Sequence, residues 1–92
     1  MMEEKLVRIL FERELRITTA ESCTGGLIAA KLVNVAGVSD VFESGYITYS
    51  EDAKMRILGV KRTTLEKYTV YSEQVAREMA EGAAKAAGAD VA

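Results

Sequence analysis

A strand-like stretch, two adjacent glycines and an apolar run follow one another between residues 16 and 33, and this junction constrains the fold most. Residues 16–20 are rich in β-branched side chains, which favour a strand. Gly25 and Gly26 permit a tight turn, and the apolar residues 24–33 predict a helix after it. A strand that turns into a helix is the repeating unit of α/β folds.

Strand and helix patterns continue to alternate along the chain. The segment FESGYITY at 42–49 is aromatic and β-branched and predicts a second strand, and ADVA at 89–92 begins a third. We expect one α/β domain over residues 1–92, layered α/β/α around a central sheet that is incomplete at its C-terminal end. Further helices are predicted at 3–15, 50–58, 63–68 and 72–87.

The ends of several predicted helices carry capping residues. Gly59 and Gly88 follow two of them and predict left-handed caps, and Ser72 stands where the N-cap of the longest helix falls. Thr63 and Glu66 have the spacing of a capping box.

The helix expected at 24–33 is apolar nearly all round, with Lys31 as its only charge. Such a helix is buried between layers or in a subunit contact. An incomplete sheet also leaves an open edge, which favours association. We therefore expect a homo-oligomer.

Composition excludes several classes of function. The net charge of −2 gives no reason to expect a nucleic-acid partner, and no apolar run is long enough to span a membrane. The chain has no histidine, so Ser-His-Asp catalysis and histidine-based zinc sites are excluded, and we expect no metal. Its single cysteine forms no internal disulfide and suits the cytoplasm.

Ser22 stands just before the glycine pair and is a candidate nucleophile that would need a base other than histidine. The turn offers N–H groups at a helix start to an oxyanion or a phosphate. The alternative is a purely structural turn in which Thr24 caps the helix.

Lys54 is the candidate base. If Ser50 is the N-cap of the helix at 50–58, Tyr49 and Lys54 occupy the two positions that touch in a hydrophobic staple. Lys54 then shares an inward face with Ile57 and Leu58, three and four residues further on. Burial and the positive helix end favour the neutral amine there, which can act as a general base. The alternative is a lysine whose stem covers the core and whose amine reaches water.

Five motifs together resemble one family. They are AESCTGG, YITYSEDAK, LGV, TLEKY and YSEQVAREMAEGA, in order between residues 20 and 83. In sequence and spacing they resemble the C-terminal domain of CinA-type competence/damage-inducible proteins, a family that includes nicotinamide mononucleotide deamidases. The resemblance covers residues 3–92.

The resemblance implies an amidohydrolase that converts nicotinamide mononucleotide and water into nicotinic acid mononucleotide and ammonia. It implies no cofactor and a small-molecule nucleotide as the partner. The catalytic residues that it implies are Ser22, Tyr49 and Lys54. The substrate-binding residues that it implies are Thr24, Gly25, Gly26 and Ser50.

The sequence departs from the family pattern in two places. Residues 68–72 read YTVYS where the family often has His-Gly-Ala-Val-Ser. The family's Thr-Gly-Ile-Ala-Gly-Pro segment and a later arginine, which complete the substrate site, do not follow ADVA. We therefore expect this chain alone to be weakly active or inactive. The alternative function is a non-catalytic nucleotide-binding or assembly module, and ammonia release separates the two.

Overall fold

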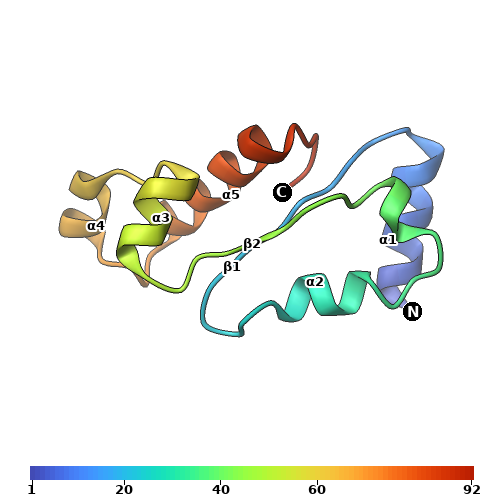
Figure 1. Ribbon diagram of the computed structural model, residues 1–92, viewed down its shortest axis with the longest axis horizontal. Helices are drawn as coiled ribbons and strands as arrows, with labels where there is room; N and C mark the ends of the chain where they lie inside the picture. The colour runs from blue at the N-terminus through green and yellow to red at the C-terminus, as the bar shows by residue number, and fades with distance from the viewer.

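A computed structural model describes all 92 residues of the chain. Five α-helices, one 3-10 helix and two short strands alternate along it (Figure 1). None of the helices combines the length and the apolar character that crossing a membrane requires. In chain order the elements are α1 Met2–Glu12, β1 Ala20–Glu21, α2 Leu27–Leu32, η1 Val38–Asp40, β2 Tyr46–Ile47, α3 Glu51–Leu58, α4 Arg62–Tyr68 and α5 Glu73–Ala87.

The two strands form a parallel sheet, which confirms the α/β class. Ala20 pairs with Tyr46 and Glu21 with Ile47. Before this ladder, Ile17 makes isolated parallel bridges, to residue 42 on one side and to residue 91 on the other. The chain end at 89–92 therefore reaches the sheet as expected, through one bridge.

Both strands are shorter than the predicted 16–20 and 42–49. The reason is a mismatch in spacing: two residues lie between Ile17 and Ala20, whereas three lie between their partners Phe42 and Tyr46. One extra residue in the second strand is a β-bulge, which interrupts the ladder. The Thr18 hydroxyl donates to the carbonyl of Ser44 inside the bulge, at 2.7 Å.

The apolar residues form two cores rather than one. The sheet lies between them, with α1 near one end of the molecule and α4 near the other (Figure 1). The first core comprises Val7, Leu10, Ile17, Leu32, Val38 and Val41. The second comprises Leu58, Val60, Leu65, Val75, Met79 and Ala83.

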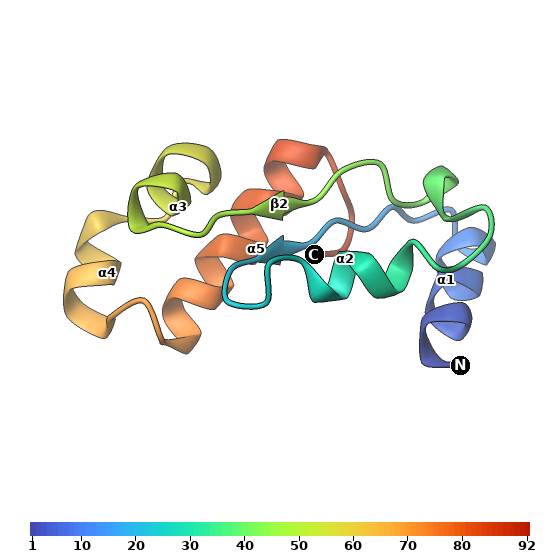
Figure 2. The same ribbon diagram turned by 60° about the horizontal axis from the view of Figure 1, so that its bottom comes forward.

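Helices cover both faces of the strands. Ala20 and Tyr46 pack against the core that α5 helps to form, whereas Glu21, the next residue, contacts the start of α2. Because successive strand residues point to opposite faces, α2 and α5 lie on opposite sides of the sheet (Figure 2).

Three of the predicted helix ends are confirmed. The Ser72 hydroxyl accepts from the N–H of Val75 and begins α5. Gly59 and Gly88 end α3 and α5 in the left-handed conformation, at φ 73° and 64°. Gly82 has a different use, because a Cβ there would collide with the carbonyl of Leu58 where α3 crosses α5.

The predicted capping box of α4 is wrong. Lys61 is the N-cap, and its side chain makes no capping bond. A residue from α5 replaces the cap: Glu78 accepts from the Lys61 N–H at 2.9 Å and from the Thr64 hydroxyl at 2.7 Å. The Glu78 carboxylate, distant in sequence, thus accepts the hydrogen bonds at the start of α4 in place of the predicted pair Thr63 and Glu66.

The helix predicted at 24–33 is shorter and more exposed than expected. It begins at Leu27, because the two glycines before it are left-handed and delay the helix. Leu32 is its only buried residue, while Leu27, Ile28 and Val33 are exposed. The prediction that this helix is buried between layers of one chain is therefore wrong, and burial in a subunit contact stays a prediction.

The contacts of Glu78 predict how stability depends on pH. The N–H of Lys61, and then the hydroxyl of Thr64, lower the pKa of Glu78 below its ordinary value of 4.5. A lowered pKa stabilises the fold above the unfolded-state pKa, and this contribution is lost as pH falls through the folded-state value. Glu78→Gln should therefore flatten the decline of the unfolding free energy on acidification below about pH 5, measured by urea denaturation.

Glu81→Gln is the matched control, because Glu81 is exposed on the same helix and makes no hydrogen bond. Its acid profile should follow that of the unmodified chain. If Glu78→Gln does so too, the carboxylate does not stabilise the start of α4.

Candidate active site

Ser22 and Lys54 meet at the end of the sheet. Ser22 directly follows β1, and Lys54 lies in the first turns of α3. The Lys54 Nζ donates to the Ser22 Oγ at 3.0 Å and to the carbonyl of Thr48 at 2.8 Å. One amine therefore joins the segments that follow the two paired strands.

Lys54 is buried, as its helical position predicted. Its side chain is only 3 % exposed, so the alternative in which the amine reaches water is wrong. No carboxylate lies within 4.0 Å of it, unlike Arg56, which pairs with Asp52 on the solvent side at 3.4 Å. The two neighbours of the amine are thus a hydroxyl and a carbonyl.

The start of α3 fixes the direction of Lys54. The Ser50 hydroxyl accepts from the Ala53 N–H at 3.0 Å, and the Ser50 carbonyl accepts from the Lys54 N–H at the same distance. Leu58, one turn further on, is buried in the second core. Because residues four apart share a helix face, anchoring Leu58 turns Lys54 inward as well.

The turn after Ser22 is built on two left-handed glycines. Gly25 and Gly26 have φ of 70° and 115°, which residues with a Cβ rarely adopt. The Gly25 N–H donates to the Ser22 carbonyl at 3.0 Å. The Thr24 hydroxyl accepts from the N–H groups of Gly26 and Leu27, so Thr24 caps the helix from two residues before the N-cap, Gly26.

Glu21 completes this turn, and its role was not predicted from the sequence. Its side chain is 5 % exposed. Its carboxylate accepts from the Ile28 N–H at 2.6 Å and from the Ala29 N–H at 3.0 Å. The alternation of strand residues could have placed Glu21 on the α2 face, but no local pattern predicts a contact seven and eight residues along the chain.

This arrangement corrects the expectation that the start of α2 offers its N–H groups to a ligand. The groups of Gly26 and Leu27 donate to Thr24, and those of Ile28 and Ala29 donate to Glu21. All four are satisfied within the chain. The helix start therefore has no free donor for an oxyanion or a phosphate.

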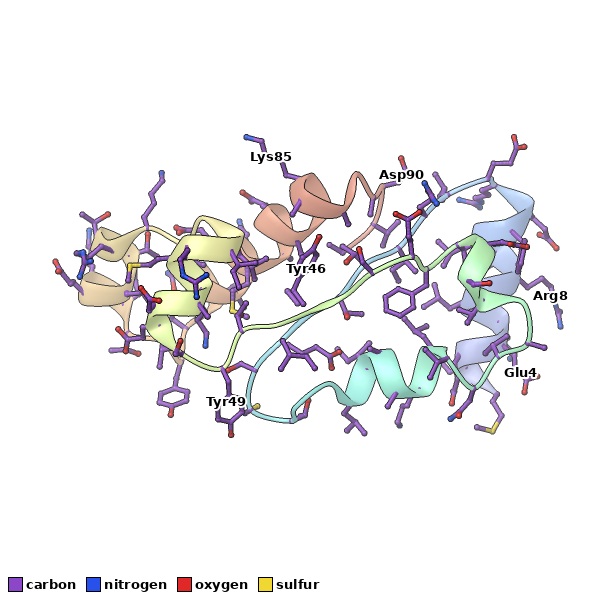
Figure 3. All side chains as sticks on the ribbon, in the orientation of Figure 1. Glu4, Arg8, Tyr46, Tyr49, Lys85 and Asp90 are labelled. Carbon is purple, nitrogen blue, oxygen red and sulfur yellow. The ribbon has the colours of Figure 1, made fainter.

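Tyr49 does not join the serine and the lysine through a hydrogen bond. It is 68 % exposed, and its phenol has no hydrogen-bond partner. Figure 3 shows Tyr46 on the α5 side of β2 and Tyr49 on the other side. The staple positions predict that the phenol and the amine meet, but no hydrogen bond joins them. Along the extended segment Tyr49 takes the face opposite to Tyr46.

The pair does not lie in the polar groove of about 610 Å³ that follows α5. That groove is lined mainly by charged side chains of α5, including Arg77 and Glu81, together with Gly59 and Lys61. It contains neither Ser22 nor Lys54.

Comparison with known proteins agrees with the α/β fold. Residues 1–92 match the family described as the CinA C-terminal domain. The chain therefore belongs to the CinA C-terminal domain family.

Two curated relatives have names that refer to this family or to competence damage. A "CinA-like protein" of Kosmotoga olearia is 57% identical over 90 residues, and a competence-damage inducible protein of Clostridium botulinum (strain Kyoto / Type A2) is 56% identical over 91. These alignments cover 98% and 99% of this chain. The chain spans 22% of the length of each relative.

Solved structures of the CinA superfamily have the same fold. The protein from Escherichia coli superposes with a TM-score of 0.93 at 43% identity, over 96% of this chain and 51% of the other. The protein CihA from Agrobacterium tumefaciens gives 0.80 at 41% identity, over 97% and 55%. The chain thus spans about half the length of these structures.

The burial of Lys54 predicts that its replacement has little effect on stability. Lys54→Met keeps most of the side-chain volume and removes a polar group from the interior, but it leaves the Thr48 carbonyl without its donor. An unsatisfied buried carbonyl costs ~1–3 kcal/mol, and removal of a buried amine offsets much of that cost. We expect the unfolding free energy, from urea denaturation, to change by no more than ~1 kcal/mol.

Lys31→Met, at an exposed position of α2, is the control for the loss of a positive charge. A loss of several kcal/mol in Lys54→Met alone would mean that the amine is needed to hold α3 against the strands.

Proposed function

We propose that the chain carries the nucleophile and the base of an amidohydrolase. The observation that carries this proposal is the 3.0 Å contact between the Lys54 Nζ and the Ser22 Oγ. A serine needs an adjacent base to become nucleophilic, and hydrogen-bond reach is the first requirement for such a base. A chain without histidine has lysine as its natural alternative.

In the first half-reaction the Ser22 Oγ attacks the carbonyl carbon of a carboxamide. The hydroxyl proton passes to the Lys54 amine, which keeps its second contact with the Thr48 carbonyl. Collapse of the tetrahedral intermediate breaks the C–N bond, and the proton on Lys54 leaves with the nitrogen as ammonia. An ester between Ser22 and the acyl group remains.

In the second half-reaction water attacks that ester. Lys54 accepts a proton from the water, the bond to Ser22 breaks, and the Ser22 Oγ recovers its proton from Lys54. The products are a carboxylic acid and ammonia, so that one amide and one water are consumed in each cycle. No other reactant is needed.

We propose nicotinamide mononucleotide as the substrate, with nicotinic acid mononucleotide and ammonia as products. Membership of the CinA C-terminal domain family supports this substrate, through the resemblance of residues 20–26 and 46–54 to the deamidases of that family. In this proposal Tyr49 relays a proton or contacts the substrate from its exposed position. Thr24, Gly25, Gly26 and Ser50 shape the binding site.

The test is ammonia release from nicotinamide mononucleotide by the gene product that contains this sequence. We expect Ser22→Ala and Lys54→Ala each to reduce kcat by ~10³-fold or more, because each removes part of one catalytic unit. The double variant should be no worse than the poorer single variant, since groups that act as a unit are not additive.

Ser39→Ala, an exposed serine in η1, is the control and should retain full activity. Near-normal turnover by Ser22→Ala would rule out covalent catalysis at this serine. The chain would then fit better the second class of function, a non-catalytic binding or assembly module.

We also propose that the chain associates with itself through α2. Leu27 and Ile28 of α2 and Val33 directly after it expose apolar side chains, and Ile47 of β2 is exposed near Gly26 at the start of the helix. Ile28 alone is 57 % exposed. Exposed apolar side chains gathered on one segment are typical of an interface.

Replacing Leu27 and Val33 together by glutamine tests this interface without adding charge. We expect the unmodified chain to have the mass of an oligomer by size exclusion with light scattering, and the double variant to shift toward the monomer. A monomer in the unmodified chain at high concentration would rule out self-association through α2.

A further inference from the structure

We propose that Glu21 is a positioning residue for Ser22: its buried carboxylate holds α2 against β1 and thereby fixes the turn that presents the serine. This inference rests on the proposed role of Ser22 as a nucleophile. It adds a residue that contacts neither the substrate nor the reacting atoms.

The contacts of Glu21 are those of an anchored group. Its two carboxylate oxygens accept separate bonds, at 2.6 Å from the Ile28 N–H and at 3.0 Å from the Ala29 N–H. The side chain is 5 % exposed. A buried carboxylate that accepts two backbone donors is held in one orientation, because every other orientation leaves a buried charge without partners.

The main chain of Glu21 is fixed as well. Its carbonyl accepts from the Thr48 N–H at 2.9 Å, and its Cα lies opposite Ile47 in the parallel ladder. The backbone of Glu21 is therefore bonded within the sheet, while its side chain is bonded to the first turn of α2. Ser22 is the next residue. Its orientation therefore depends on Glu21, which is held by the sheet through its backbone and by α2 through its side chain.

The turn between Ser22 and α2 has few other restraints. The Gly25 N–H donates to the Ser22 carbonyl, and the Thr24 hydroxyl accepts from two N–H groups at 3.1 and 3.3 Å. Cys23, Thr24 and Gly25 are all exposed. Leu32 packs the far end of α2 into the first core, but without the Glu21 carboxylate the first turn of α2 would be tied to the strand mainly through this exposed turn.

Glu21→Gln tests the proposal at constant side-chain size. Glutamine offers one acceptor oxygen, and its amide group would face the second backbone donor, so one of the two bonds is lost. We expect the amide protons of Ile28 and Ala29 to exchange faster with solvent. Because small displacements of a reacting group have large effects on rate, we expect the acylation of Ser22 to slow by ~10-fold or more.

The probe is a fluorophosphonate, which labels activated serines, and mass spectrometry of the intact chain and its peptides gives the rate and the site. We expect the maximal labelling rate to fall in Glu21→Gln while the concentration for half-maximal rate stays unchanged. Glu21→Asp is the second variant: it keeps the charge but is too short to reach both N–H groups, so it should lose rate as well.

Ser72→Ala is the matched control for stability. It removes a side-chain cap from α5, where the Ser72 hydroxyl accepts from the Val75 N–H at 3.2 Å. Ser72 is no part of the proposed site. We expect a similar loss of thermal stability but an unchanged labelling rate, measured at a temperature where circular dichroism shows all the variants to be folded.

The outcomes separate the two proposals. If the unmodified chain is labelled at Ser22 and both Glu21 variants are labelled equally fast, Glu21 is not a positioning residue, and the role of Ser22 stands. If Ser72→Ala slows labelling as much as Glu21→Gln does, the effect is one of general stability, and the inference is overturned. These measurements use the gene product that contains this sequence. If Ser22 is not labelled in that unmodified protein, the proposed function fails, and this inference fails with it.

Discussion

The parallel pairing of β1 with β2 is the constraint on which the rest of the structure depends. Only two residue pairs form this ladder, yet it joins segments 26 residues apart, as in Ala20 and Tyr46. Parallel strands end at the same edge of a sheet, so Ser22 and Thr48 leave the ladder side by side. Lys54 binds both of these residues, and its amine therefore depends on the pairing for its position.

So short a ladder needs support from the helices on either side. One core comprises residues of α1, α2 and η1, and the other comprises residues of α3, α4 and α5, with the strands between them. Small cores of this kind contribute limited stability, so single polar contacts carry more weight. Glu78 holds α4 to α5, and Glu21 holds α2 to β1.

The sequence predicts those features that depend on neighbours within one or two turns. The caps at Ser50, Ser72 and Gly59 follow local rules, and so does the inward direction of Lys54. The 3.0 Å contact with Ser22 required one further step, namely the alignment of two strand ends.

The features that the sequence did not predict depend on distant partners. Glu21 accepts hydrogen bonds at the start of α2, and Glu78 accepts them at the start of α4, although neither residue lies in the helix that it caps. Each carboxylate lies between seven and 17 residues from its donors in the sequence. Tyr49 is exposed and makes no hydrogen bond to Lys54, although the helix-start pattern predicts that the two side chains meet. The bulge between Phe42 and Tyr46 shortened both strands, and no turn residue marks it unambiguously, although Gly45 lies within it.

Glu21 and Lys54 are both buried, but they bind different partners, and this difference is compatible with the proposed chemistry. Glu21 and Lys54 lie on adjoining elements, but the carboxylate binds backbone N–H groups and the amine binds two oxygens. A direct ion pair would favour the protonated lysine, which cannot accept a proton from Ser22. By satisfying Glu21 at the start of α2, the fold keeps the carboxylate away from the amine. In the proposed mechanism, one acidic residue thus orients the nucleophile while leaving the base free to act.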